Sequence, residues 1–208
     1  DKKLKGLWII GEDIVQTDPN SAHVVEAMNS LELLVVQEIF MSETAKLATV
    51  VLPGTTFLEK DGTFTNTERR IQRVNRAVPP LPGTKPDGVI VTDMMQKLGF
   101  DQPTYDADQM LKEIADVVPF FKGVTRERLG KLGLQWPVQE DGTDTQILHT
   151  ESFKLGKGRL KNFDWKESNE IETNKKEYPL ILTTSRVLQH YNAATMTRRT
   201  KNINIVDE

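Results

Sequence analysis

The sequence predicts an α/β fold: an open sheet of parallel strands with flanking helices, followed by the beginning of a β domain. Short apolar runs alternate with helix-like segments over about the first ninety residues. A stretch rich in glycine and proline, residues 53–86, then interrupts this alternation. A new β-prone run begins at residue 179, after a segment of mostly charged residues at 161–177.

Composition excludes several classes of protein. The 208 residues are enough for one large domain or two small ones. The chain has no cysteine, which excludes disulfides, cysteine-ligated zinc, iron–sulfur ligation and thiol nucleophiles within these residues. A net charge of -3 argues against nucleic-acid binding. No apolar run is long enough to span a membrane and no signal peptide is visible in residues 1–20, so a cytoplasmic location is expected.

The first predicted unit is a βαβ unit. Residues 7–10 and 33–36 are short apolar runs and are predicted to be buried parallel strands. Between them, Asp18 is expected to cap a helix whose first residue is Pro19, since apolar residues follow at helical spacing.

A second helix and a third strand are predicted next. Ser42 is expected to cap a short helix that ends at Lys46, and residues 48–52 are a β-prone run that Pro53-Gly54 stops. Residues 53–86 are predicted to be loop, and Asp87 is expected to cap a helix that runs through Leu98. The remaining predictions are helices at 106–118 and 125–132, a charged connector at 161–177, a strand at 179–184, and β-prone Ile203, Ile205 and Val206 near the end.

Two polar motifs follow the predicted strands, where ligands bind in open α/β sheets. Gly11-Glu12-Asp13 comes directly after the first strand, where glycine permits close approach and the next helix offers a positive N-terminus. It lacks a full G-x-G-x-x-G, and an ordinary βα turn is the alternative. Gln37-Glu38 ends the second strand, where a carboxylate can accept ribose hydroxyls or can simply face solvent.

Two further segments carry groups suited to phosphate. In residues 59–72, Arg69 and Arg70 can bind phosphate or carboxylate and Lys60 can act as a point charge, unless they form a surface salt-bridge cluster. Residues 184–192 combine hydroxyls, a guanidinium, an imidazole and an aromatic ring, a set suited to pyrophosphate and a stacked ring. His190 is expected to bind rather than to transfer protons, because no nucleophile with an orienting partner is evident near it.

These motifs, in this order and spacing, resemble the molybdopterin oxidoreductases of the dimethyl-sulfoxide-reductase superfamily. Among them, the chain is most similar to the catalytic alpha subunit of formate dehydrogenases. The residues that carry the resemblance are Gly11–Asp13, Val35–Phe40, Glu43–Ala45, Val50–Pro53, Glu59–Gln72 and Thr183–Arg199.

The resemblance implies a piece of a larger subunit. It places residues 1–135 in a Rossmann-like α/β domain that binds molybdopterin guanine dinucleotide, 136–177 in a connector, and 178–208 at the start of a C-terminal β-barrel that binds the same dinucleotide. Two such cofactors hold one molybdenum or tungsten ion in the family. The metal's protein ligand and the cysteines of the iron–sulfur clusters would then lie upstream, and this chain alone would be inactive.

The resemblance also assigns roles to residues. No catalytic residue and no metal ligand is expected in this chain, and Gly62, Thr63 and Asn66 are expected to shape a loop beside the cofactor. The residues matched to the guanosine end of one cofactor are Glu12, Asp13, Gln37, Glu38, Lys60 and Asp87. The residues matched to the barrel loop around pterin and pyrophosphate are Thr184, Ser185, Arg186, Val187, Leu188, Gln189, His190, Tyr191, Asn192 and Ala193.

The activity that the resemblance implies is the two-electron oxidation of formate to carbon dioxide at the metal, with electrons passing through iron–sulfur clusters to NAD or another acceptor. The implied partners are the remainder of the alpha subunit, electron-transfer subunits with iron–sulfur or flavin groups, and formate, without nucleic acid or a membrane span. Two alternatives remain: an assimilatory nitrate reductase, and the metal-free scaffold subunit of an NADH:quinone oxidoreductase.

Overall fold

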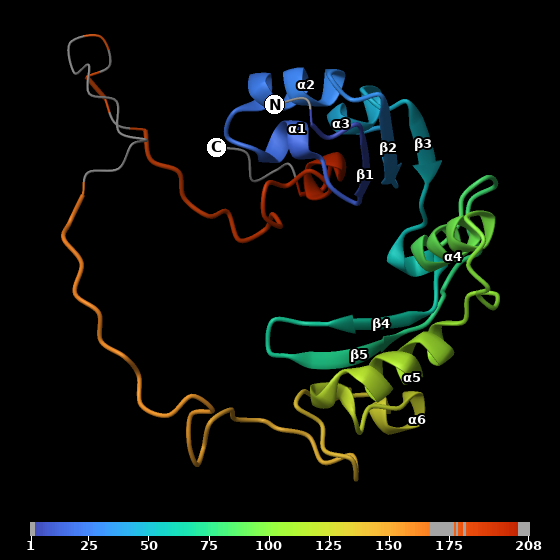
Figure 1. The fold of residues 1–208 in the computed structure, drawn as a ribbon, viewed down its shortest axis with the longest axis vertical. Helices are drawn as coiled ribbons and strands as arrows, with labels where there is room; N and C mark the ends of the chain where they lie inside the picture. The colour runs from blue at the N-terminus through green and yellow to red at the C-terminus, as the bar shows by residue number, and fades with distance from the viewer. Residues whose placement is uncertain (1–2, 167–176, 178, 181, 204–208) are drawn as a thin grey trace. The chain divides into compact units, whose positions relative to one another are not determined.

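The computed structural model of the protein describes residues 3–166, 177, 179–180 and 182–203 (Figure 1). By their contacts the residues divide into two compact units, Asp1–Leu148 and His149–Glu208. The domain limits at 135/136 and 177/178 stay predictions, whereas the contacts divide the chain after Leu148.

A parallel sheet forms the first part of the first unit. It consists of β1 (Gly6–Ile10), β2 (Leu33–Glu38) and β3 (Val50–Pro53), in the order β1-β2-β3. The predicted α/β class and its three strands are confirmed. The core beside this sheet consists of buried side chains from strands and helices: Ile9, Met28, Leu34, Val36 and Ala45. Burial of this apolar set is what holds the helices on the sheet.

Three short helices accompany this sheet: α1 (Ile14–Thr17), α2 (Ser21–Asn29) and α3 (Glu43–Lys46). The predicted cap at Asp18 is wrong, because α1 already occupies the residues before it and the chain is extended at Asp18. Asn20 caps α2 instead, where its side chain accepts a hydrogen bond from the backbone N–H of His23 at 3.2 Å. Ser42 caps α3 as predicted, since its hydroxyl accepts from the backbone N–H of Ala45 at 3.1 Å.

A hairpin lies within residues 53–86, where the sequence predicts only loop. After the 3₁₀ turn η1 (Phe57–Glu59), strands β4 (Gly62–Thr65) and β5 (Arg70–Val74) pair antiparallel, and β6 (Leu134–Gln135) pairs with β5. The glycines and prolines that suggested loop lie outside the paired residues or at their ends. The hairpin forms because Ile71 is fully buried in a second core, with Leu111, Val124, Leu129 and Val138.

The remaining helices of this unit are α4 (Asp87–Lys97), α5 (Ala107–Val117) and α6 (Arg126–Leu129), with the 3₁₀ turn η2 (Pro119–Phe121) between the last two. Asp87 is the first helical residue rather than the cap, which is Pro86. Helices α5 and α6 lie within the predicted helices at 106–118 and 125–132, and Asp106 and Thr125 cap them. Helix α6 is shorter than predicted, because Gly130 leaves the helical conformation with φ of 50°.

The described part of the second unit has one helical turn, η3 (Thr197–Arg199). The strand predicted at 179–184 is not formed by residues 179–180 and 182–184, and residue 181 lies outside the described residues. A strand requires a hydrogen-bonded neighbour, and none of the described residues pairs with this segment. Ile205, Val206 and most of the predicted connector, 167–176, also lie outside the described residues. No described helix is long and apolar enough to cross a membrane.

Candidate functional site

The candidate site lies at the carboxyl edge of the parallel sheet. Strand β1 ends at Ile10, β2 at Glu38 and β3 at Pro53, so their following residues meet at one edge. Gly11 has φ of 66°, and its N–H donates to the carbonyl of Gln37 at 2.9 Å. This left-handed conformation is one that glycine adopts without strain. A Cβ added at Gly11 would meet no atom within 4 Å, so the conformation, rather than crowding, favours glycine here.

Asp87 is the centre of the site. Its Oδ1 accepts a hydrogen bond from Nε2 of Gln37 at 2.8 Å, and its Oδ2 forms an ion pair with Nζ of Lys60 at 2.6 Å. The three residues come from the end of β2, the residue after η1 and the first turn of α4. The structure therefore brings together three residues that the sequence analysis assigned to one cofactor.

The electrostatics of this cluster keep Asp87 ionised. Burial by itself raises the pKa of Asp87, but the hydrogen bonds from Lys60 and Gln37 and the charge of Lys60 outweigh it, so the pKa is lowered. A carboxylate has about four acceptor positions. Two of them face Lys60 and Gln37, and the side chain is 40% exposed. Asp87 can therefore accept further hydrogen bonds from a ligand.

Gln37 and Gly54 add to the acceptor character of this edge. Gln37 is 1% exposed, and its Oε1 is buried with no hydrogen-bond partner among the described residues. Such an acceptor is costly to leave unpaired, which favours a ligand that supplies an N–H or O–H. Gly54 lies close to the cluster, since a Cβ built on it would lie 3.2 Å from Oδ1 of Asp87. The sequence indicates Gly54 only as the end of a strand, because Asp87, which it approaches, lies 33 residues further along the chain.

Asp13 and Glu38 are already bonded within the chain. Asp13 is 4% exposed, and its Oδ1 accepts from the backbone N–H and hydroxyl of Thr44 at 3.0 and 2.8 Å. Its other oxygen accepts from Gln16. Asp13 thus joins the end of β1 to the start of α3, and its direct contact with a cofactor stays a prediction. Glu38 is half-buried and accepts from the N–H of Ile39, while Glu12 is exposed.

The side chains of Arg69 and Arg70 both bond to other groups of the protein. The guanidinium of Arg69 donates to the carbonyls of Trp136, Thr145 and Gln146 and lies 5.6 Å from the centre of the Trp136 ring. Arg70 forms an ion pair with Glu68 at 3.3 Å. Arg69 therefore fastens the hairpin to residues 134–146, and Arg70 fits the surface salt bridge that the sequence analysis kept as an alternative.

The predicted barrel loop, Thr184–Ala193, lies in the second unit and is described only within it. Its backbone turns where the N–H of His190 donates to the carbonyl of Val187 at 3.2 Å. His190 Nδ1 is 2.9 Å from the hydroxyl of Thr197, so a neighbouring threonine orients the ring. The residues on either side of His190, Gln189 and Tyr191, are exposed. Their contact with a cofactor stays a prediction.

Comparison with known proteins shows what the chain is similar to. Residues 1–97 match the family model described as molybdopterin oxidoreductase. The F420-dependent formate dehydrogenase subunit alpha of Methanocaldococcus jannaschii is 44% identical over 97% of this chain. Residues 1–97 therefore match a molybdopterin oxidoreductase domain.

Two other relatives are similar over nearly the whole chain, and one solved structure shares its fold. The alpha subunit of F420-dependent formate dehydrogenase 2 of Methanococcus maripaludis is 44% identical over 100% of this chain, and a putative formate dehydrogenase of Staphylococcus aureus is 41% identical over 98%. The chain spans 30%, 31% and 21% of the length of these three relatives. Acetylene hydratase from Pelobacter acetylenicus has a TM-score of 0.50 and 20% identity over 59% of this chain and 17% of its own, which supports the fold alone.

The match of residues 1–97 to the molybdopterin oxidoreductase model implies a molybdopterin cofactor, and the sheet edge fits one end of such a group. The unpartnered Oε1 of Gln37 and the open positions of Asp87 are acceptors for a ligand with N–H groups, and Lys60 keeps donors for an oxygen. Among the described residues, no three His, Asp or Glu side chains lie close enough together to hold a metal ion.

Proposed function

We propose that this chain is part of the catalytic subunit of a molybdenum- or tungsten-dependent formate dehydrogenase. It binds the guanosine end of a molybdopterin guanine dinucleotide. The observation that carries the proposal is the acceptor cluster of Gln37 and Asp87 at the carboxyl edge of the sheet. The similarity to formate dehydrogenase alpha subunits over nearly the whole chain supports the choice of substrate.

Guanine fits this cluster chemically. Its N1–H and exocyclic amino group are neighbouring donors, and an ionised carboxylate beside an amide oxygen offers neighbouring acceptors. In the proposal, Asp87 and Oε1 of Gln37 accept from the guanine edge. Lys60 orients the Asp87 carboxylate and Glu38 accepts from the ribose hydroxyls, as acidic residues at this place do in dinucleotide-binding sheets.

The division of labour follows from what these residues can do. When bound, the cofactor with its metal supplies the chemistry by which formate loses two electrons and a proton to become carbon dioxide. The residues of this chain bind and orient the dinucleotide, and they exclude water from one end of it. Residues Thr184–Ala193, with Arg186 and His190 foremost, are proposed to hold pterin and pyrophosphate from the predicted barrel.

The proposal includes partners. The remainder of the alpha subunit would supply the metal's protein ligand and the iron–sulfur segment, and electron-transfer subunits with iron–sulfur or flavin groups would receive the electrons. A cytoplasmic location is part of the proposal. The electron acceptor is F420, NAD or another carrier, since two of the relatives named above are F420-dependent and the sequence resemblance implies NAD or another acceptor.

One experiment tests the proposal against its alternatives. The full-length subunit with its partners is purified, and formate-dependent dye reduction is measured, followed by the same assay with NAD and with F420. Nitrate-dependent oxidation of a reduced dye is measured in parallel, and GMP released by acid is quantified. We expect formate oxidation with GMP in the protein. Nitrate turnover without formate turnover would favour a nitrate reductase, and a native complex without GMP or metal would favour the scaffold subunit.

A further inference from the structure

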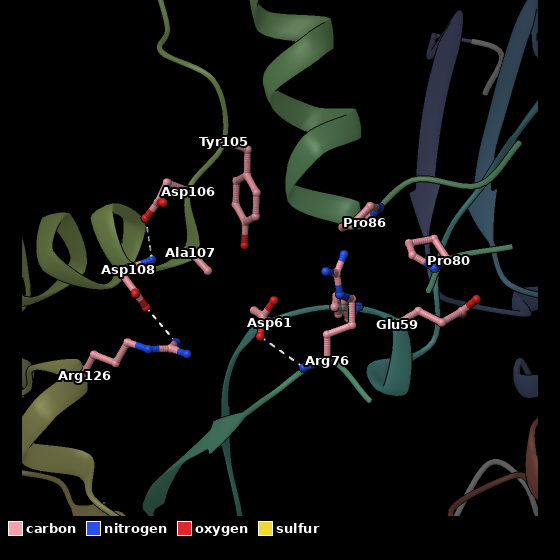
Figure 2. Close-up of a pocket in the computed structure, with 11 residues that line it drawn as sticks. Glu59, Asp61, Arg76, Pro80, Pro86, Tyr105, Asp106, Ala107, Asp108 and Arg126 are labelled. Carbon is pink, nitrogen blue, oxygen red and sulfur yellow. Dashed lines mark hydrogen bonds and ion pairs between the residues drawn. The ribbon is translucent and has the colours of Figure 1, made fainter. Parts of the chain in front are cut away.

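A second site is a cleft of about 510 Å³ (Figure 2). It adjoins the sheet-edge cluster, because Lys60 lines the cleft and also pairs with Asp87. Its walls come from the start of the hairpin, the chain after β5, the N-terminal ends of α4 and α5, and Arg126 of α6. The volume is in the range of small-molecule sites, about 300–1,000 Å³. Pro80 and Pro86 are rigid apolar parts of the wall.

Several charged groups in this cleft are already occupied. Arg126 forms an ion pair with Asp108 at 2.8 Å. Glu59 accepts from the backbone N–H and hydroxyl of Thr56 and from the backbone N–H of Leu81, and these bonds lower the pKa of Glu59. One oxygen of Asp106, Oδ1, accepts from the backbone N–H groups of Asp108 and Gln109 in the first turn of α5. The charges of Arg126 and Glu59 are therefore already paired or hydrogen-bonded within the protein, whereas Oδ2 of Asp106 has no hydrogen-bond partner among the described residues.

Three other groups keep free hydrogen-bonding positions. The guanidinium of Arg76 and the hydroxyl of Tyr105 have no hydrogen-bond or ion-pair partner among the described residues. One oxygen of Asp61 accepts from the backbone N–H of Arg76 at 3.0 Å, which leaves its other oxygen open. Figure 2 shows these three side chains directed at the same space. Arg76 and Asp61 thus present opposite charges to one cleft without pairing their side chains.

The hydroxyl of Tyr105 is protonated and can donate a hydrogen bond to a ligand. Burial raises the pKa of its hydroxyl, and the negative charges of Asp106 and Asp87 raise it further, so the hydroxyl stays protonated. Its ring packs against Gly88 at the start of α4, where an added Cβ would lie 2.1 Å from the ring. The ring therefore cannot move further toward the helix, and Figure 2 shows its hydroxyl directed into the cleft.

We propose that this cleft binds a small zwitterion of the α-amino-acid type, with its carboxylate on Arg76 and Tyr105 and its ammonium on Asp61. Arginine binds carboxylates through paired N–H groups, and a tyrosine hydroxyl adds a third donor. A zwitterion satisfies both charges at once. Asp61 and Arg76 are exposed, so a ligand with one charge forms a charge-assisted hydrogen bond with only one of them, whereas a zwitterion forms such bonds with both.

The test uses the full-length protein with its partners and isothermal titration calorimetry. Each standard amino acid is titrated one at a time, with acetate and methylammonium as probes that lack one of the two charges. We expect saturable binding of at least one amino acid and at least about tenfold weaker binding of both single-charge probes. Arg76→Gln and Asp61→Asn should each weaken amino-acid binding at least about tenfold, and Tyr105→Phe should weaken it less.

The control variant is Arg73→Gln, which removes an exposed arginine of β5 that does not line the cleft. It should bind like the wild type. Absence of binding for every amino acid would overturn the proposal. So would unchanged amino-acid binding in Arg76→Gln. A structure of the full-length protein in which another segment fills the cleft would also overturn it. GMP content separates this site from the sheet edge: it should stay unchanged in Arg76→Gln, and its loss would assign the cleft to the cofactor instead.

Discussion

Replacing Asp87 by asparagine separates cofactor binding from folding. The substitution removes one charge from a side chain that is 40% exposed, in an ion pair whose lysine is 25% exposed. Solvent screens such pairs, so we expect a loss of about 0.2–1 kcal/mol in the free energy of unfolding. Asparagine keeps an oxygen that can accept from Gln37 or Lys60. The fold should therefore change little.

The effect on the cofactor should be larger. Charge-assisted hydrogen bonds contribute about 1.5–3 kcal/mol, so losing the carboxylate should weaken retention of the guanosine end by about 10–150-fold. The assay is GMP released by acid per subunit of purified full-length protein, with thermal unfolding measured on the same samples.

Asp93→Asn is the matched control for this experiment. Asp93 lies on the same helix and pairs with Lys85 at 2.6 Å, with its side chain 39% exposed. It resembles Asp87 in chemistry and exposure but does not reach the sheet edge. Equal GMP content in Asp87→Asn and Asp93→Asn would refute the role of Asp87. A fall in stability of several kcal/mol in Asp87→Asn would show that the carboxylate acts on the fold instead.

Three further predictions follow from the same contacts. Gly54→Ala places a Cβ 3.2 Å from Oδ1 of Asp87, so GMP content should fall more than the melting temperature, and unchanged GMP would contradict the close approach. Because the pKa of Asp87 is lowered in the folded state, its contribution is present above its unfolded pKa and is lost as pH falls through the folded pKa. The stability difference between wild type and Asp87→Asn should therefore vanish in acid, as chemical denaturation over a pH series can measure. Arg69→Ala leaves three carbonyls without their donor and should destabilise the protein by about 1–3 kcal/mol, whereas an unchanged melting temperature would show that water replaces the guanidinium.

The parallel sheet was predictable because its strands are continuous apolar runs. Such runs are typical of strands covered on both faces, and Leu34 and Val36 are indeed buried. The hairpin was not predictable, because its two strands are not continuous apolar runs. Ile71 is its one fully buried side chain, and the turn before β5 uses Arg69 at φ of 67°, a conformation that usually calls for glycine or asparagine.

Long-range contacts explain most of what the sequence did not indicate. Arg69 is held by carbonyls 67 to 77 residues away, so its charge alone suggested a phosphate ligand. Resemblance to a family named Gln37, Lys60 and Asp87 for one site, and their binding of a cofactor stays a prediction. Resemblance does not give their geometry: Gln37 bonds to Asp87 across 50 residues, which only the fold shows.

The central claim is that Gln37 and Asp87 bind the guanine of the cofactor, and a structure of the cofactor-loaded full-length protein tests it most directly. The decisive distances run from the guanine nitrogens to the Asp87 carboxylate and to Oε1 of Gln37. We predict that both fall within about 3.2 Å, the ordinary limit for N–H···O hydrogen bonds. A guanine bound elsewhere, or a protein segment donating to these two side chains in its place, would contradict the claim.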